Sequence, residues 1–188
     1  ENLDIFFVAI GNEKGKEKFC KYTGFSKNKL KVVNDARLHH LVGASKGIDI
    51  GLGGWINMTL MLMGIGSSKT IIEVIRGYTG DKEANQIYND NDQINLFNIL
   101  KFSGKLFEKP FGNGYLRPFE LATFRLNNMI EIFKNWKDYM IDTNYLPQRS
   151  CTFILDENNN FKYKFISKDI LNYSKNMKEP LSFLAEYL

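Results

Sequence analysis

The chain of 188 residues is long enough for one compact domain with a sizeable core, or for one domain with a large insertion. Hydrophobic residues make up 44% of it and aromatic residues 14%, a composition that excludes an intrinsically disordered protein. The net charge of +4 comes from lysines scattered among acidic residues, without the dense basic block of a nucleic-acid-binding protein. We therefore expect no nucleic-acid partner.

The cysteines and histidines predict neither a disulfide framework nor a metal site. Cys20 and Cys151 stand far apart and belong to no C-x-x-C pair, so a reducing compartment fits better than secretion. His39 and His40 are adjacent but have no cysteine nearby with which to bind zinc. We predict no bound metal or cofactor.

The first part of the chain predicts a strand, a helix and a second strand. Residues 3–10 form an apolar run typical of a strand buried on both faces of a parallel sheet. No signal-peptide pattern precedes this run, and we expect a processed or truncated start. Residues 13–22 predict an amphipathic helix that stops at Gly24, and residues 30–33 predict the second strand. This order is typical of a right-handed parallel crossover.

The middle of the chain changes character after a short helix. Asp35 is placed to cap a helix over residues 36–44. Residues 47–118 are rich in glycine and predict a mostly helical insertion packed on the core of a single domain, residues 1–188. Within it, the apolar run 55–65 is about half of the ~20 residues that a membrane-spanning helix needs. We expect a buried helix there, with a membrane-surface or partner-facing helix as the alternatives.

The last part of the chain predicts a long helix, a hairpin and a terminal helix. Apolar residues recur at steps of four and three over residues 121–140, which is typical of a helix with one face in the core. Residues 152–155 and 161–165 flank a polar turn and predict a β-hairpin. Pro180 favours a helix over residues 181–188.

Several segments together resemble a known family. They are residues 8–11 (VAIG), 19–25 (FCKYTGF), 34–37 (NDAR), 42–43 (VG), 76–84 (RGYTGDKEA), 119–129 (FELATFRLNNM), 148–149 (QR), 152–153 (TF) and 180–184 (PLSFL). With this order of elements, they resemble the peroxiredoxin-like (AhpC/TSA, peroxiredoxin-like 2) family, in the branch found in plastids and their algal and parasite relatives. The resemblance covers nearly the whole chain.

The resemblance implies an α/β fold: a thioredoxin-like mixed sheet flanked by helices, of which this chain holds the C-terminal two-thirds. Catalytic members carry a reactive cysteine, often in a C-x-x-C, at the start of the helix after the central strand. There the helix N-terminus lowers the thiol pKa and favours the thiolate. That segment belongs upstream of Glu1. A plastid, apicoplast-type location follows from the same resemblance.

Arg149 and Cys151 are the candidate site residues. The arginine at the position of Arg149 in peroxiredoxins points toward the peroxide and the thiolate through charge-assisted hydrogen bonds. A structural contact of this arginine is the alternative. Relatives have two glycines after it, where this chain has Ser150 and Cys151. Cys151 begins a strand that faces the active site in this fold, so we weigh a redox role against an inert strand cysteine. Cys20, in mid-helix, is expected to be a small buried thiol.

The resemblance also predicts a gap in the sheet. The strand that leads to the catalytic cysteine lies between the strands that residues 3–10 and 152–155 resemble, and this chain has no candidate for it. Each buried backbone group left unpaired costs about 1 to 3 kcal/mol. We expect an upstream part of the same polypeptide, a second chain that donates a strand, or an altered fold that joins the two halves directly.

Two functions follow as hypotheses. The full-length product is a thiol-dependent reductase of peroxides or disulfides, with a thioredoxin-type electron donor, and the 188 residues alone are expected not to catalyse. Whether the product is an enzyme depends on the upstream C-x-x-C. The alternative is a non-catalytic scaffold or partner-binding subunit of an organellar complex that docks through residues 55–65. A nucleotide-binding protein is disfavoured because the phosphate-binding glycine spacings are missing.

Overall fold

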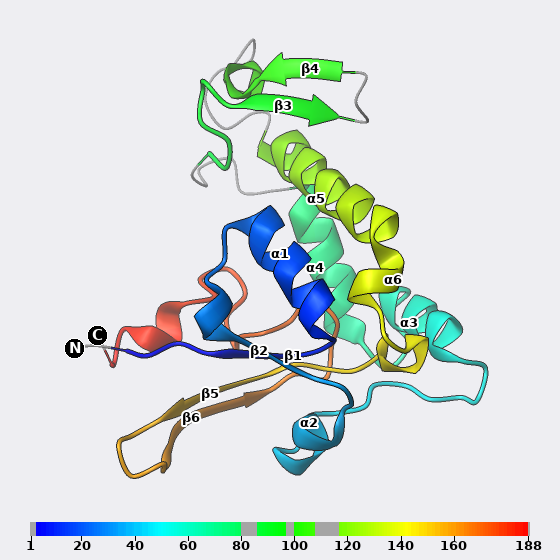
Figure 1. Ribbon diagram of the computed structural model, residues 1–188, viewed down its shortest axis with the longest axis vertical. Coiled ribbons are helices and arrows are strands. Elements are labelled where there is room, and N and C mark those ends of the chain that lie inside the picture. Colours follow the sequence, from blue (N-terminus) through cyan, green and yellow to red (C-terminus); the bar gives the residue numbers. More distant parts are fainter. Residues whose placement is uncertain (1–2, 80–85, 97–99, 108–116, 188) are drawn as a thin grey trace. The chain divides into compact units, whose positions relative to one another are not determined.

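The computed structural model describes residues 3–79, 86–96, 100–107 and 117–187 and shows a mixed α/β protein (Figure 1). The chain divides into two compact units. Unit 1 consists of Glu1–Ile71 and Lys137–Leu188, and unit 2 is Ile72–Trp136. The predicted insertion, residues 47–118, overlaps unit 2 only over residues 72–118, because residues 47–71 belong to unit 1.

Unit 1 contains two two-stranded sheets with helices between and after their strands (Figure 1). Its elements are β1 (Phe7–Ile10), α1 (Glu13–Thr23), η1 (Lys27–Lys29), β2 (Leu30–Val33), α2 (Arg37–Leu41), α3 (Gly54–Leu62), η3 (Thr143–Tyr145), β5 (Cys151–Leu155), β6 (Phe161–Ile166) and η4 (Ser182–Leu184). Two helices cross the border between the units, α4 (Ser68–Thr79) and α6 (Trp136–Tyr139).

The predicted helix and second strand at the start of unit 1 are confirmed, and the first strand forms over Phe7–Ile10 of the predicted residues 3–10. β1 and β2 pair in parallel, from Phe7 opposite Leu30 to Ile10 opposite Val33. Asn12 caps α1, since its Oδ1 accepts the backbone N–H of Gly15 at 2.9 Å. Gly24 ends the helix with a left-handed φ of 73°, a conformation that costs glycine little.

The predicted burial of β1 on both faces is wrong. Phe7 is 52% exposed, and Ile5, Phe6 and Val8 are exposed as well. The reason is that β1 has β2 as its one hydrogen-bonded neighbour among the described residues, so one edge and part of both faces remain uncovered. Phe7 is covered in part by the ring of Phe25, whose centroid lies 5.0 Å away.

The predictions for the next two helices hold in part. Asp35 Oδ1 accepts the backbone N–H of Arg37 at 2.9 Å, but α2 ends at Leu41 rather than at residue 44. Gly43, with a φ of 89°, turns the chain away. α3 forms within the apolar run as expected. Its predicted burial is wrong for most of its surface, because only Gly54, Asn57 and Met61 are buried.

Unit 2 is built on an aromatic cluster. Its elements are most of α4, then β3 (Gln93–Leu96), β4 (Leu100–Ser103), η2 (Gly104–Phe107) and α5 (Arg117–Lys134). The fully buried Phe107 stacks on Tyr88 at a centroid distance of 5.8 Å and meets Phe102 edge-on at 5.7 Å. Glu120 is fully buried, and its Oε1 accepts the backbone N–H groups of Ile87 and Tyr88 at 2.9 and 2.8 Å.

The long predicted helix over residues 121–140 is divided in the structure. α5 ends at Lys134 and the short α6 follows as a separate element. The expected core stripe is wrong for Met129 and Phe133, which are exposed. The aromatic cluster of unit 2 lies near the start of α5, at Phe119 and Phe124, so the later turns of the helix extend beyond it.

The predicted hairpin is confirmed, whereas the predicted terminal helix is wrong. β5 and β6 pair antiparallel around a turn in which Asp156 Oδ1 accepts the backbone N–H groups of Asn158 and Asn160, both at 2.9 Å. Between Pro180 and residue 187, the last that the structure describes, the helical structure is the single turn η4. There Phe183 stacks on Tyr163 of β6 at a ring-centroid distance of 4.5 Å.

A charged cluster joins α1 to α6. Both Lys14 and Lys18 lie 2.7 Å from the carboxylate of Asp138, and their hydrogen bonds lower its pKa from the ordinary value of 3.8. A carboxyl with a lowered folded pKa stabilises the protein above its unfolded pKa, and this contribution is lost as the pH falls through the folded pKa. Asp138→Asn should therefore lower the melting temperature at about pH 6 but make little difference near about pH 2. An equal loss at both pH values, in circular-dichroism melts, would contradict the assignment.

No helix in the described part of the chain is long and apolar enough to cross a bilayer.

Candidate functional site

Arg149 is a buried cation at the start of the β5–β6 hairpin. It is 5% exposed, and its backbone N–H donates to Ser45 O at 2.9 Å. Its Nη2 donates to Leu146 O at 3.2 Å and its Nε donates to Pro147 O. These bonds use two of the five N–H groups of a guanidinium. Burial lowers its pKa to about 10, which still leaves the side chain positively charged at neutral pH.

The loop that carries Arg149 is held by residues that lie about a hundred positions earlier in the sequence. Gln148 Oε1 lies 3.0 Å from His40 Nε2, and Gln148 Nε2 donates to Ser45 O at 2.9 Å. Gly47 packs so closely that a Cβ on it would lie 2.2 Å from Pro147 O. The segments around Ser45 and Pro147 therefore form one rigid frame for the arginine.

The acidic residue that affects the pKa of Arg149 is Asp169, which acts through its charge alone. The negative charge of Asp169 opposes the effect of burial on the pKa of Arg149, but no ion pair joins the two side chains. Asp169 Oδ1 instead accepts the backbone N–H of Lys69 at 3.1 Å at the start of α4. Arg149 thus has N–H groups that no protein acceptor among the described residues takes up. Such a guanidinium can bind an oxyanion or a thiolate through charge-assisted hydrogen bonds.

Cys151 lies close to Arg149 in sequence but has no activated thiol. It is half-buried in β5, opposite Ile166, and burial raises the pKa of its thiol, although the charge of Lys164 acts in the opposite direction. A raised pKa leaves little thiolate at neutral pH, and the thiolate is the nucleophilic form. These features favour an inert strand cysteine. Cys20 is buried in α1, as expected of a small packed thiol.

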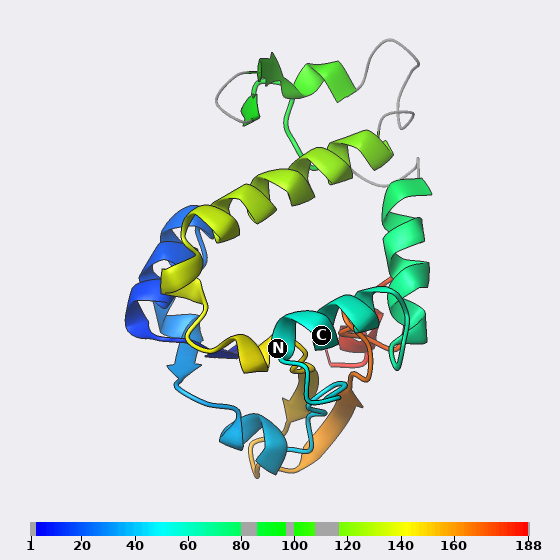
Figure 2. The same cartoon turned by 90° about the vertical axis from the view of Figure 1, so that its right-hand side faces the viewer.

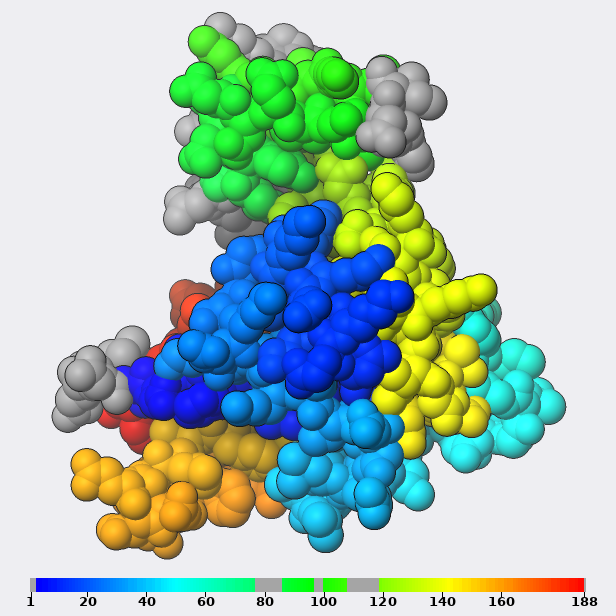
Figure 3. Space-filling view, in the orientation of Figure 1, coloured from blue at the N-terminus to red at the C-terminus, as the bar shows by residue number. Residues whose placement is uncertain are grey.

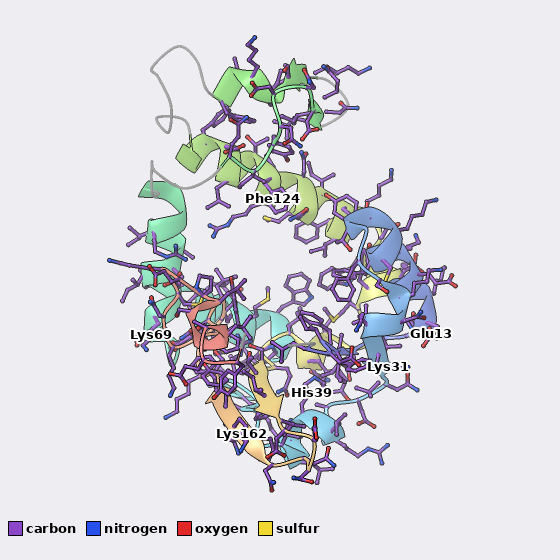
Figure 4. The ribbon with its side chains drawn as sticks, turned by 90° about the vertical axis from the view of Figure 1, so that its left-hand side faces the viewer. Glu13, Lys31, His39, Lys69, Phe124 and Lys162 are labelled. Atoms are coloured by element: carbon purple, nitrogen blue, oxygen red, sulfur yellow. The ribbon has the colours of Figure 1, made fainter. Side chains whose placement is uncertain are left out.

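The two histidines take different positions. His40 contacts Gln148, 108 residues later, and so helps to place the Arg149 loop, a role that no local sequence signal indicates. His39, labelled in Figure 4, lies in α2 and is half-buried. Burial lowers the pKa of His39, while the backbone of Val8 in β1 opposes that effect. Among the described residues no group of three or more histidine, cysteine and acidic side chains could hold a metal ion.

Four strand edges in unit 1 have no strand partner among the described residues, one on each of β1, β2, β5 and β6. β1 pairs with β2 alone and β5 pairs with β6 alone within the described ranges, and the two pairs form separate sheets. The two halves therefore do not close directly on each other, and no described strand joins β1 to β5. An unpaired strand edge presents a row of backbone N–H and C=O groups to any extended segment that can reach it.

Comparisons with known proteins give no further guide. No model of a protein family matches the chain, and neither the curated proteins nor the solved structures contain a significant match.

The site consists of a buried cation, part of whose guanidinium has no acceptor among the described residues, and of strand edges in two separate sheets. It can bind and orient an anion. Burial raises the pKa of the Cys151 thiol, which disfavours Cys151 as a nucleophile.

Proposed function

We propose that this chain is part of a thiol-dependent redox protein with a peroxiredoxin-like, thioredoxin-type fold. In this proposal Arg149 orients a thiolate and its peroxide substrate. A further strand pairs between β1 and β5, and the thiolate lies at the start of the helix that follows this strand. Those elements belong to the same polypeptide or to a second chain. The observation that carries the proposal is a buried, incompletely hydrogen-bonded guanidinium at the start of β5.

The proposed chemistry matches what a buried arginine does well. A thiolate attacks one peroxide oxygen, the O–O bond breaks, and the products are a sulfenic acid and an alkoxide or hydroxide that takes up a proton. Negative charge therefore moves from sulfur to the departing oxygen. A fixed guanidinium stabilises both positions of that charge. Two thiols of a thioredoxin-type donor then reduce the sulfenic acid, becoming a disulfide and releasing water.

The same protein would act in a plastid, of the apicoplast type. This part of the proposal depends on the family resemblance alone.

The test is peroxide turnover by the full-length protein. With a thioredoxin, its reductase and NADPH, we expect peroxide-dependent NADPH oxidation that alkylation of the thiols abolishes. Cys151→Ser should keep this activity, because the raised pKa of Cys151 makes it a poor nucleophile. A folded full-length protein without turnover would contradict the proposal, and loss of turnover in Cys151→Ser would assign the nucleophile to this chain.

A second candidate is a non-catalytic scaffold or partner-binding subunit of an organellar assembly. One observation favours it: α3 leaves Trp55, Ile56 and Leu62 exposed where the sequence predicts a buried helix. The absence of turnover in the assay above, together with isolation of the full-length protein in a larger complex from the organelle, would support this candidate over the first.

A further inference from the structure

Gln148, the residue before Arg149, joins three segments of unit 1. Its backbone N–H donates to Tyr145 O at 3.0 Å, in η3. Its side-chain Nε2 donates to two carbonyl oxygens, Ser45 O at 2.9 Å and Arg149 O at 3.0 Å. Ser45 O also accepts the backbone N–H of Arg149 at 2.9 Å. The Gln148 amide and the Arg149 backbone therefore share one acceptor, and the Gln148 amide bonds to both sides of this contact.

These contacts determine which way the Gln148 amide faces. If its oxygen and nitrogen exchanged places, an oxygen would lie 2.9 and 3.0 Å from two carbonyl oxygens, neither of which has a proton to donate. Gln148 Oε1 therefore faces His40 Nε2, at 3.0 Å. Because an amide oxygen only accepts hydrogen bonds, His40 carries a proton on Nε2. The neutral ring with its proton on Nε2 and the charged ring both meet this requirement.

His40 is held in turn by α2 and by the turn after it. Its backbone N–H donates to Ala36 O at 2.9 Å, and its carbonyl accepts the N–H of Gly43 at 3.0 Å. α2 lies close to the β5–β6 hairpin (Figures 1 and 2), where a Cβ on Gly43 would lie 3.3 Å from Ile166 Cδ1. In the space-filling view α2, in light blue, lies at the surface of unit 1 beside the orange hairpin (Figure 3). The contact between His40 and Gln148 thus joins a surface helix to the start of β5.

The hydrogen bonds of the Arg149 guanidinium fix it relative to its own loop only. Its Nε and Nη2 donate to Pro147 O and Leu146 O, which belong to the residues just before it. The loop is joined to the segment after α2 by two donors on Ser45 O, the Arg149 N–H and the Gln148 amide. Loss of the Gln148 amide would leave a single hydrogen bond to this acceptor. The direction of the remaining guanidinium N–H groups therefore depends on Gln148.

We propose that Gln148 is a positioning residue for Arg149, and that His40 holds the Gln148 amide in the orientation that this role requires. The inference rests on the proposed function, since it concerns the arginine that orients the thiolate and the peroxide. Neither side chain needs to touch the substrate. A displacement of about 1 Å at a group that acts on reacting atoms can lower the rate about 10²-fold. Loss of either side chain should therefore lower turnover more than it weakens substrate binding.

Hydrogen exchange at the Arg149 amide, in the full-length protein, tests the positioning without any need for turnover. Gln148→Leu removes both side-chain donors, and we expect this amide to exchange about tenfold faster. His40→Leu leaves the Gln148 amide free to rotate and should raise the same rate. His40→Gln keeps an N–H donor of similar reach and should restore slow exchange. The matched control is Gln93→Leu at an exposed glutamine of β3 in unit 2, which should leave the rate unchanged.

Peroxide turnover tests the consequence of the positioning. Gln148→Leu should lower kcat at least about tenfold with little change in KM, and His40→Gln should retain the kcat that His40→Leu loses. His40 lies on a surface helix, so its two variants test the proposal even where Gln148→Leu does not fold. Unchanged exchange at Arg149 in a folded Gln148→Leu variant, or equal effects of His40→Gln and His40→Leu, would overturn the proposal. If the folded full-length protein has no turnover, the proposed function fails, whereas the exchange rates still decide whether Gln148 holds Arg149.

Discussion

Arg149→Lys is expected to lower kcat/KM for peroxide by about 10²-fold in the full-length protein. The guanidinium donates to Leu146 O and Pro147 O through two of its nitrogens and keeps further N–H groups for an anion. A lysine retains the charge but carries one nitrogen, so it cannot hold both carbonyls and the reacting atoms in a fixed arrangement. The loss should fall on kcat more than on KM if the arginine acts mainly on the transition state.

A matched control is available in the same unit. Arg37→Lys makes the same substitution at an exposed arginine that pairs with Asp35 at 2.8 Å, and it should leave turnover unchanged. Thermal melts of both variants separate a local effect from loss of fold, since Arg149 is also a structural contact. Unchanged kcat/KM in a folded Arg149→Lys variant would leave the arginine with its structural role only.

Gly47→Ala is expected to lower the free energy of unfolding by about 2 to 5 kcal/mol. Two effects add at this position. Gly47 has a φ of 79°, which a residue with a Cβ adopts at a cost of about 1 to 2 kcal/mol. A Cβ there would also lie 2.2 Å from Pro147 O, a backbone atom that cannot move without displacing the Arg149 loop. Urea unfolding at constant pH measures the change.

Gly51→Ala separates the two effects. Gly51 has nearly the same φ, 76°, but open space around the position of a Cβ. It should therefore lose only the conformational part, about 1 to 2 kcal/mol. If Gly47→Ala costs no more than Gly51→Ala, the contact between the Gly47 and Pro147 segments is looser than the structure shows. A larger cost, together with reduced peroxide turnover, would show that this contact positions Arg149.

The sequence by itself determined the elements whose signals are local. Asn12 and Gly24 set the ends of α1, and the turn at Asp156 sets the hairpin, because their hydrogen bonds and backbone conformations involve residues at most four positions away. The mixed α/β class follows from these elements. Arg149 and Cys151 could be chosen from the sequence only through the family resemblance.

Only the tertiary structure decided burial and the surroundings of the site. Whether β1 is covered depends on a neighbouring strand, and Phe183, beyond Pro180, stacks on Tyr163 of β6 rather than on a residue near it in sequence. The backbone of Arg149 bonds to Ser45, about a hundred positions earlier in the sequence, and no local preference encodes that contact. Backbone preferences act over a few residues, whereas exposure, desolvation and pKa depend on atoms brought together from distant parts of the chain.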